Sequence, residues 1–276
     1  MEIERIEKPL RQMRKLLKHL TENPSPEQVH RLRTRARKVE AIAGALAAVE
    51  APKSKQLLKA IKPLRKAAGA VRDMDVLTGN LLALPRKESG TSLIKLEEHL
   101  GATRKQSAGK LLDVVDMQRS KARRRLKRYA EAIESATSGK KPVARAGTQT
   151  LDEETGTDSR ADHLADEIAR CSTLSHNNLH AFRLKVKELR YVLQLLPYAS
   201  KGLVDVLGKV KDQIGEWHDW EQLLDTAREV LDPRTDRELL QLIEATSRRK
   251  FMQALAGANG MRQRYFNSAV IRKAAS

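Results

Sequence analysis

Two segments decide the fold, VHRLRTRARKVEAIAGAL at 29–46 and LHAFRLKVKELRYVLQLL at 179–196. In both, apolar residues recur every three or four positions, which is the period of an amphipathic helix. The same period covers most of the chain, and no stretch alternates with period two for long enough to indicate a strand. The sequence therefore predicts an all-α protein.

The chain contains an internal repeat. The two segments align position by position, and a second aligned pair follows them, GAVRDMDVL at 69–77 and GEWHDWEQL at 215–223. Two tandem copies of one helical unit explain this pattern, and each copy has the size of a four-helix bundle. We expect bundles at 1–136 and 161–276. Residues 137–160 are polar and nearly lack large apolar side chains, so they predict a flexible linker.

Helix boundaries in the first copy follow from breaks in the apolar period. The acidic stretch VRDMD at 71–75 is interpreted as a turn, and Pro63 is expected to kink its helix. The expected helices lie at about 3–20, 28–49, 54–70, 91–108 and 110–136, with a further one beginning after the acidic turn.

Net charge restricts the partners. The 276 residues include 53 Lys+Arg and 35 Asp+Glu, a formal charge of +18, which favours nucleic acid, an anionic membrane surface or a smaller polyanion. Aromatic residues make up 3% of the chain, too few for the platforms on which proteins stack bases, so a ligand without bases is favoured. The apolar stretch at 41–49 is too short to cross a bilayer, and the single cysteine, Cys171, excludes an intrachain disulfide. We therefore expect a cytoplasmic protein that binds no membrane.

Rows of cations lie beside the apolar seams, which are the lines of apolar residues that recur every three or four positions. These seams run from Val29 to Leu46, from Leu57 to Val71 and from Leu179 to Leu196. On the two deciding helices, several seam residues are followed directly by a basic one: His30, Arg33 and Arg37, then His180, Arg183, Lys187 and Arg190. Neighbouring helices repeat the rule at Arg11, Arg14, Lys18, Lys62, Arg65, Arg72, Lys211 and His218. A charged helical row usually marks a solvated face, but such faces mix Glu with Lys for mutual support. These rows are mostly of one sign and recur in both copies, which predicts a bound anion.

Catalytic signatures are missing from the sequence. It has no GxxxxGK[ST] loop, no HExxH and no GxSxG, so we expect no catalytic residue, no metal and no cofactor. His176 and His180 have metal-ligand spacing, but Pro26 occupies the position of His176 in the first copy. The carboxylates of VRDMD and its counterpart are expected to cap the next helix or to orient neighbouring cations. The basic run at 119–128 is interpreted as a solvated face.

Taken together, VHRLRTRARK, LHAFRLKVKELRY, VRDMDVL and IGEWHDWEQLL resemble the two halves of a CHAD domain, and the resemblance covers the chain outside 137–160. It implies two four-helix bundles related by a pseudo-twofold, with a basic cavity between and across them that binds inorganic polyphosphate. It also implies an association with polyphosphate granules. CHAD domains often accompany a CYTH triphosphatase domain, and this sequence resembles a stand-alone CHAD protein without one.

The resemblance assigns the family's binding positions. They fall on His30, Arg33, Arg37 and Lys38 in the first copy, on His180, Arg183, Lys187, Arg190 and Tyr191 in the second, and on Arg72 with Asp73 and His218 with Asp219 as cation and orienting carboxylate. Glu40 departs from the family pattern, because it stands where the family has a basic residue. The resulting expectation is non-catalytic polyphosphate binding, with a basic nucleic-acid-binding protein as the alternative and a phosphate-processing enzyme as a third reading.

Overall fold

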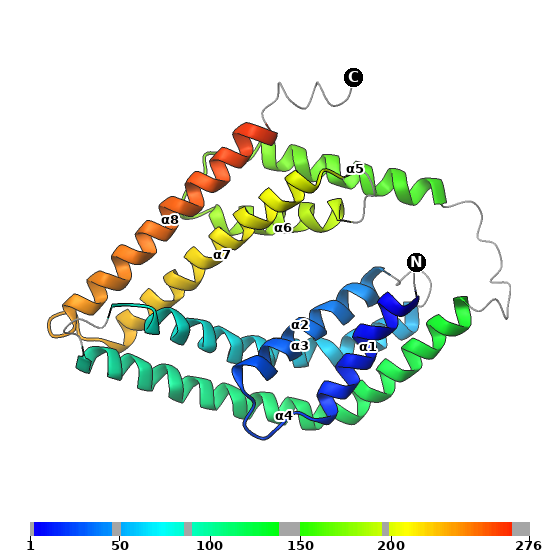
Figure 1. The fold of residues 1–276 in the computed structure, drawn as a ribbon, viewed down its shortest axis with the longest axis horizontal. Helices are drawn as coiled ribbons and strands as arrows, with labels where there is room; N and C mark the ends of the chain where they lie inside the picture. Colours follow the sequence, from blue (N-terminus) through cyan, green and yellow to red (C-terminus); the bar gives the residue numbers. More distant parts are fainter. Residues whose placement is uncertain (1–2, 46–50, 86–89, 138–149, 195–198, 267–276) are drawn as a thin grey trace. The chain divides into compact units, whose positions relative to one another are not determined.

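The computed structural model describes residues 3–45, 51–85, 90–137, 150–194 and 199–266. These residues form eight α-helices and contain no strand (Figure 1). The prediction of an all-α protein is therefore confirmed.

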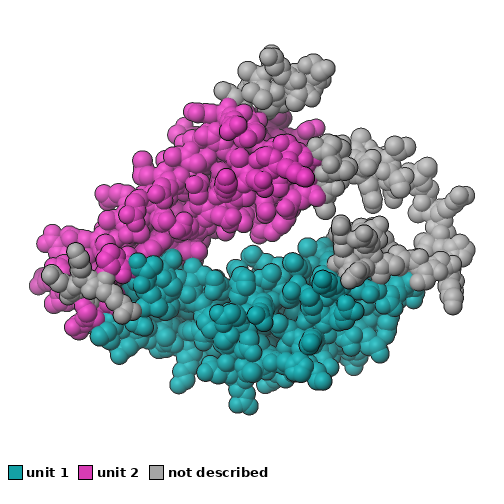
Figure 2. All heavy atoms as spheres, viewed as in Figure 1, with its two compact units in different colours: residues 1–83, 94–144 teal, residues 84–93, 145–276 magenta. Residues whose placement is uncertain are grey.

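The chain divides into two compact units, residues 1–83 with 94–144 and residues 84–93 with 145–276 (Figure 2). Unit 1 holds α1 (Ile3–Lys18), α2 (Pro26–Ala45), α3 (Ala51–Leu82) and most of α4 (Gly90–Thr137). Unit 2 holds α5 (Thr150–Ala169), α6 (Leu179–Leu193), α7 (Lys201–Val230) and α8 (Arg237–Tyr265). In each unit the helix that carries the first aligned segment packs on the helix that carries the second, α2 on α3 and α6 on α7.

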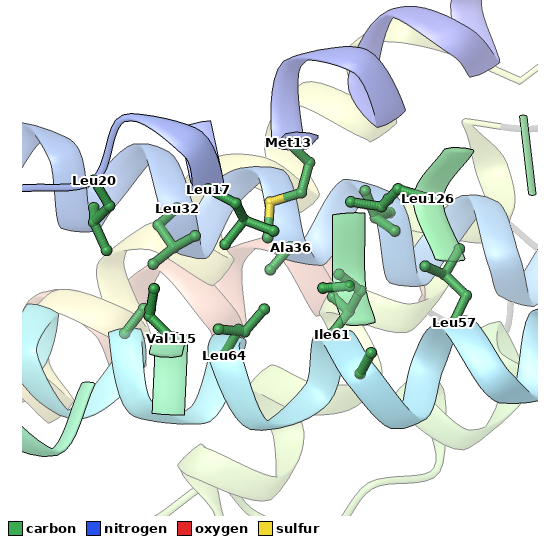
Figure 3. Packing of buried hydrophobic residues seen from close by; sticks show 14 of the residues in the cluster. Met13, Leu17, Leu20, Leu32, Ala36, Leu57, Ile61, Leu64, Val115 and Leu126 are labelled. Carbon is green, nitrogen blue, oxygen red and sulfur yellow. The ribbon is translucent and has the colours of Figure 1, made fainter. Parts of the chain in front are cut away.

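Unit 1 is built around one apolar core to which all four helices contribute (Figure 3). The predicted seam of α2 is fully buried from Val29 to Ala43, and that of α3 is fully buried from Leu57 to Val71. Met13 of α1 and Leu126 of α4 complete the same cluster. Full burial of a large aliphatic side chain stabilises the fold by about 1.5–3 kcal/mol. The buried seams therefore hold the flanks of α2 and α3 in register.

Unit 2 has its own core, in which the α6 seam meets α5, α7 and α8. Phe182 and Val186 of α6 are buried against Ile214 and Trp217 of α7. Of the predicted α6 seam, Leu193 is only half-buried, and Leu196 lies outside the described residues, as does Leu46 in the first copy. The seam positions thus fix which side of α6 faces α7.

The predicted acidic turn at 71–75 is wrong. VRDMD lies inside α3, and its counterpart lies inside α7, so neither group of carboxylates caps a helix. The apolar period runs straight through the segment, with Val71, Leu77 and Leu81 all buried, while Asp73 faces solvent. Charged residues on the solvated side of a helix do not interrupt it, and no glycine or proline stands in VRDMD to do so.

Two other boundaries differ from the sequence prediction. The helices expected at 91–108 and 110–136 form the single helix α4, in which Gly109 is exposed and costs only about 1 kcal/mol relative to alanine. Helix α5 begins at Thr150, so residues 150–160 are helical where a linker was predicted. The rest of the predicted linker up to residue 149 lies outside the described residues, apart from Thr137 at the end of α4.

Residues 84–93 belong with unit 2, although the sequence assigned them to the first bundle. Ser92 donates a hydrogen bond of 2.7 Å to the carboxylate of Asp236, which is buried at the N-cap of α8. This contact joins the start of α4 to the start of α8 within the same unit.

Candidate anion-binding surface

Arg33 of α2 lies across a glycine of the neighbouring helix. A Cβ built on Gly69 of α3 would stand 3.7 Å from the Nε atom of Arg33, and the Arg33 side chain is half-buried. Lys62 and Arg72 share this flank of α3, because they stand about two turns before and one turn after Gly69. A guanidinium therefore lies against α3 between two further cations, at a distance that would also accommodate a Cβ.

The electrostatics around Arg33 are mostly repulsive. Burial lowers the pKa of the Arg33 guanidinium below its usual range, and the charge of Arg37 lowers this pKa further. Asp73 opposes the shift, while Arg65 and Arg72 add to it. Arginine stays protonated at neutral pH, so α2 and α3 hold several like charges close together. A bound anion would relieve this repulsion.

Unit 2 repeats the arrangement of arginine over glycine. A Cβ on Gly215 of α7 would come 2.8 Å from Nη2 of Arg183, and one on Gly208 would come 3.3 Å from Nε of Arg190. The Nε atom of Arg183 donates to the backbone oxygen of Lys211 at 3.1 Å. The Nε atom of Arg190 is buried and has no hydrogen-bond partner. Both arginines are thus held against α7, and each residue is half-buried.

The same aligned positions make the contact in both units. Arg33 and Arg183 occupy equivalent places in the first pair of aligned segments, and Gly69 and Gly215 open the second pair. Sequence reasoning identified the arginines but missed the glycines, although a glycine at the same position of both aligned segments was a visible signal. Close approach of another group is a common reason for glycine inside a helix.

Two histidines meet at the α6–α7 contact. The ring centroids of His180 and His218 are 4.6 Å apart, which brings two predicted binding residues together. About two turns after His180 on α6, the Nζ atom of Lys187 lies 5.8 Å from the ring centre of Tyr191. Tyr191 is 51% exposed. In unit 1, the predicted residues His30, Arg37 and Lys38 are exposed on α2.

Some of the predicted cations are already paired. The Nε atom of Arg65 donates to Oε1 of Glu40 at 3.0 Å, and the Nζ atom of Lys211 lies 2.6 Å from the carboxylate of Asp212. Glu40 therefore neutralises part of the cation group on α2 and α3. We leave Arg65 and Lys211 out of the proposed site.

The row predicted on α1 lies elsewhere in unit 1. Arg11, Arg14 and Lys18 follow one another along one flank of α1, whereas Gln12 and Leu16, on the opposite flank, line a cleft between α1 and α2. The row therefore lies on the side of the α1 seam away from α2. The structure does not bring this row together with the cations of α2.

Comparison with known proteins identifies the family of the chain. The family model described as the CHAD domain matches residues 4–228, and no curated protein or solved structure matches significantly. The chain belongs to the CHAD family. The matched region of this CHAD protein contains both aligned segment pairs, whereas α8 lies beyond it. Within the described residues, no helix of the CHAD protein has the length and apolarity needed to cross a membrane.

Carboxylates inside the helices of the CHAD protein contact an arginine and a histidine. Asp75, whose side chain is 3% exposed, accepts a hydrogen bond of 2.6 Å from Nε of Arg104, and the same arginine donates to the backbone oxygen of Pro24. Its counterpart Glu221 contacts His176 and accepts a hydrogen bond from Ser247. Within the described residues, no group of three potential metal ligands occurs.

The basic run at 119–128 is engaged with its own unit. Arg119 pairs with Asp116 at 3.3 Å, Lys127 pairs with Glu131 at 3.5 Å, and Arg125 donates to the backbone oxygen of Gln56. These contacts reduce the charge that the run presents to a ligand. The rows on α2 and α6 are the stronger candidates for an anion site.

Replacing Gly215 by alanine is expected to displace Arg183 without unfolding unit 2. The new methyl would stand 2.8 Å from Nη2 at the mobile end of the arginine, so the side chain has to swing away from α7. Alanine itself favours a helix over glycine by about 0.5–1 kcal/mol, so the melting temperature should stay within a few degrees of wild type. If this surface binds polyphosphate, as the sequence predicts, loss of one charge-assisted contact should weaken that binding about tenfold in calorimetry.

Gly260→Ala is the matched control, because a Cβ at this position of α8 meets nothing within 4 Å. It should bind as wild type does. Wild-type affinity in the Gly215→Ala variant would mean that the position of Arg183 against α7 does not matter for the ligand.

Proposed function

We propose that this CHAD protein binds inorganic polyphosphate without transforming it. The proposed contacts come from two rows, which we name by helix. The α2 row consists of His30, Arg33, Arg37 and Lys38, with Arg72 beside it, and the α6 row consists of His180, Arg183, Lys187, Arg190 and Tyr191, with His218 beside it. Asp73 and Asp219 are proposed to orient the neighbouring cations.

The observation that carries the proposal is the arginine packed over glycine, Arg33 over Gly69 and Arg183 over Gly215. Arg33 lies near further cations, and its burial together with their charge disfavours the charged guanidinium in the absence of an anion. Arginine can present two parallel N–H donors to phosphate oxygens, and lysine adds point charge. A chain with about one negative charge per phosphate unit would match such a row along its length.

The burial of most aromatic side chains favours a ligand without bases. Trp217, Trp220, Phe182 and Tyr129 are buried, so they serve the cores of the two units. Tyr191 is exposed, but it is a single ring beside Lys187. Binding of single-stranded nucleic acid usually draws on several stacking platforms at about 1–3 kcal/mol per base. These facts favour polyphosphate over the nucleic-acid alternative.

The cellular role belongs to the same proposal. We place the protein in the cytoplasm at polyphosphate granules, as the family resemblance implies. In this reading each unit contributes one row, and the pseudo-twofold relation between the units remains a prediction. The protein would act as a binding or targeting component.

A calorimetric comparison tests the proposed ligand. The intact protein is titrated with long-chain polyphosphate and with duplex DNA at the same salt concentration, about 150 mM, and concentrations are expressed per phosphate. We expect polyphosphate to bind at least about a hundredfold more tightly, a difference of about 2.7 kcal/mol. Comparable affinities would favour the nucleic-acid function instead.

Binding should strengthen as the pH falls. Histidine ordinarily titrates near pH ~6.5, and a polyanion beside His30 or His180 favours the protonated ring. The ligand should therefore bind more tightly at pH 6 than at pH 8 when ionic strength is matched, and proton uptake should accompany binding between these values. Replacing His30 and His180 by glutamine should remove most of this difference. Equal affinities of wild type at the two pH values would argue against direct histidine contacts.

A further inference from the structure

A second cationic site lies in unit 1, on the other side of α2 from Arg33 and Arg37. Helices α1 and α2 enclose a cleft of about 640 Å³. Lys15 of α1 and His19, the residue that follows this helix, line it on one side, and Arg31 and Arg35 of α2 line it on the other. Arg31 and Arg35 are four residues apart and so project from one face of α2. The cleft therefore has cations on both walls.

The cations of this cleft lack the neutralising partners found at the corresponding place in unit 2. There, α5 and α6 are joined by Lys185 with Glu167 at 3.0 Å and by Arg160 with Glu188. The hydrogen bond from Lys185 lowers the pKa of Glu167, as expected for an ion pair. By contrast, none of the described residues that line the α1–α2 cleft is a carboxylate.

One carboxylate near the cleft, that of Glu27, accepts a hydrogen bond from a neighbouring residue. Glu27 acts electrostatically on Arg31. Its Oε2 atom, however, accepts a hydrogen bond of 3.0 Å from the Ser25 hydroxyl, at the start of α2. Glu27 therefore balances at most part of the positive charge on the α2 wall.

The cleft also offers an apolar surface and an unpaired acceptor. Leu16 and Leu20 lie between the cationic walls, and Leu16 is half-buried. Gln12 contributes to the lining, and its Oε1 atom is buried without a hydrogen-bond partner. Pockets for organic ligands combine an apolar surface with a few polar groups in this way, and their volumes run from about 300 to 1,000 Å³. Inorganic phosphate alone would use neither the leucines nor the acceptor.

We infer that the α1–α2 cleft binds an organic phosphate of the nucleotide class. Arg31 and Arg35, aided by Lys15 and His19, hold the phosphate groups. The ring lies over Leu16, and an amino or hydroxyl group of the ligand donates to the Gln12 amide after a small rotation of that amide. This inference is independent of polyphosphate binding by the α2 and α6 rows.

The test compares ATP with inorganic tripolyphosphate, which carries a similar charge but no ring. Titration calorimetry of the intact protein at about 150 mM salt should show ATP binding at least about fivefold more tightly. Replacing both Arg31 and Arg35 by glutamine should weaken ATP binding about tenfold or more and leave long-chain polyphosphate affinity near wild type. The exposed pair Lys105 and Lys110, changed to glutamine, removes the same charge from α4 and should change neither ligand.

Methyl NMR of the wild-type protein provides a second readout that does not depend on a variant. The Leu16 and Leu20 methyl resonances should shift with ATP and stay in place with tripolyphosphate. The inference is overturned if the double glutamine variant keeps wild-type ATP affinity. It is equally overturned if tripolyphosphate binds as tightly as ATP, or if the leucine resonances do not respond to ATP.

Discussion

Reversing four cations of the two rows is expected to lower polyphosphate affinity by more than about a thousandfold. The four positions are Arg33, Arg37, Arg183 and Lys187. A hydrogen bond to a charged group contributes about 1.5–3 kcal/mol, and each 1.4 kcal/mol is a factor of ten in affinity. Glutamate at these positions removes the attraction and adds repulsion. Calorimetry or a filter-binding assay with long-chain polyphosphate measures the loss.

Helicity should survive this change because the four positions flank the seams. The adjacent residues Leu32, Ala36, Phe182 and Val186 fill the cores and are untouched. Far-ultraviolet circular dichroism should therefore match wild type. Tight binding by a folded variant would show that the ligand lies elsewhere.

A control with the same change in net charge separates position from total charge. It reverses four exposed cations that lie on α4, on α8 or in the turn before α8. These are Lys105, Lys110, Arg234 and Arg249. This control should lose only the general electrostatic attraction, a few-fold at about 150 mM salt, because exposed charges are largely screened beyond about 8 Å.

Salt should weaken polyphosphate binding steeply. A flexible polyanion releases condensed counterions when its phosphates are neutralised, and for single strands the logarithmic slope is about −0.7 for each phosphate contacted. With about six contacts, raising salt from 50 to 200 mM should lower the affinity by about 10²–10³. Titrations at four or five salt concentrations give the slope directly.

The slope also reports which cations take part. Replacing Arg33 and Arg37 by glutamine should make the salt slope shallower by about 0.7 for each of the two lost contacts. Lys105→Gln with Lys110→Gln should leave the slope unchanged. A wild-type slope near zero would contradict binding through rows of ion pairs.

The buried seams could be predicted from the sequence because a helix has one strong period. Leu32, Ala36 and Val39 were chosen by spacing alone, and all three are fully buried. The same spacing puts Arg33 and Arg37 beside the seam, where the structure finds one half-buried and the other exposed. Local periodicity thus predicted the cores and the flanks of single helices.

Features that depend on contacts between helices could not be read in this way. The pairing of Arg65 with Glu40 joins residues far apart in sequence, and no local pattern shows that it neutralises a predicted cation. The row of Arg11 and Arg14 has the right spacing, but the packing of α1 leaves it on the flank away from α2. The helical start of α5 was missed because polar residues remove the apolar signal without forbidding a helix.

Arginine side-chain NMR tests most directly whether polyphosphate lies on the α2 and α6 rows. In protein labelled with ¹⁵N at arginine, polyphosphate should shift the guanidinium Nη resonances of Arg33, Arg183 and Arg190. The resonances of Arg104 and Arg262 should stay in place, since Asp75 and backbone carbonyls already hold these guanidiniums. Shifts confined to the basic run at 119–128 or to α8, with those of the two rows unchanged, would contradict the proposed site.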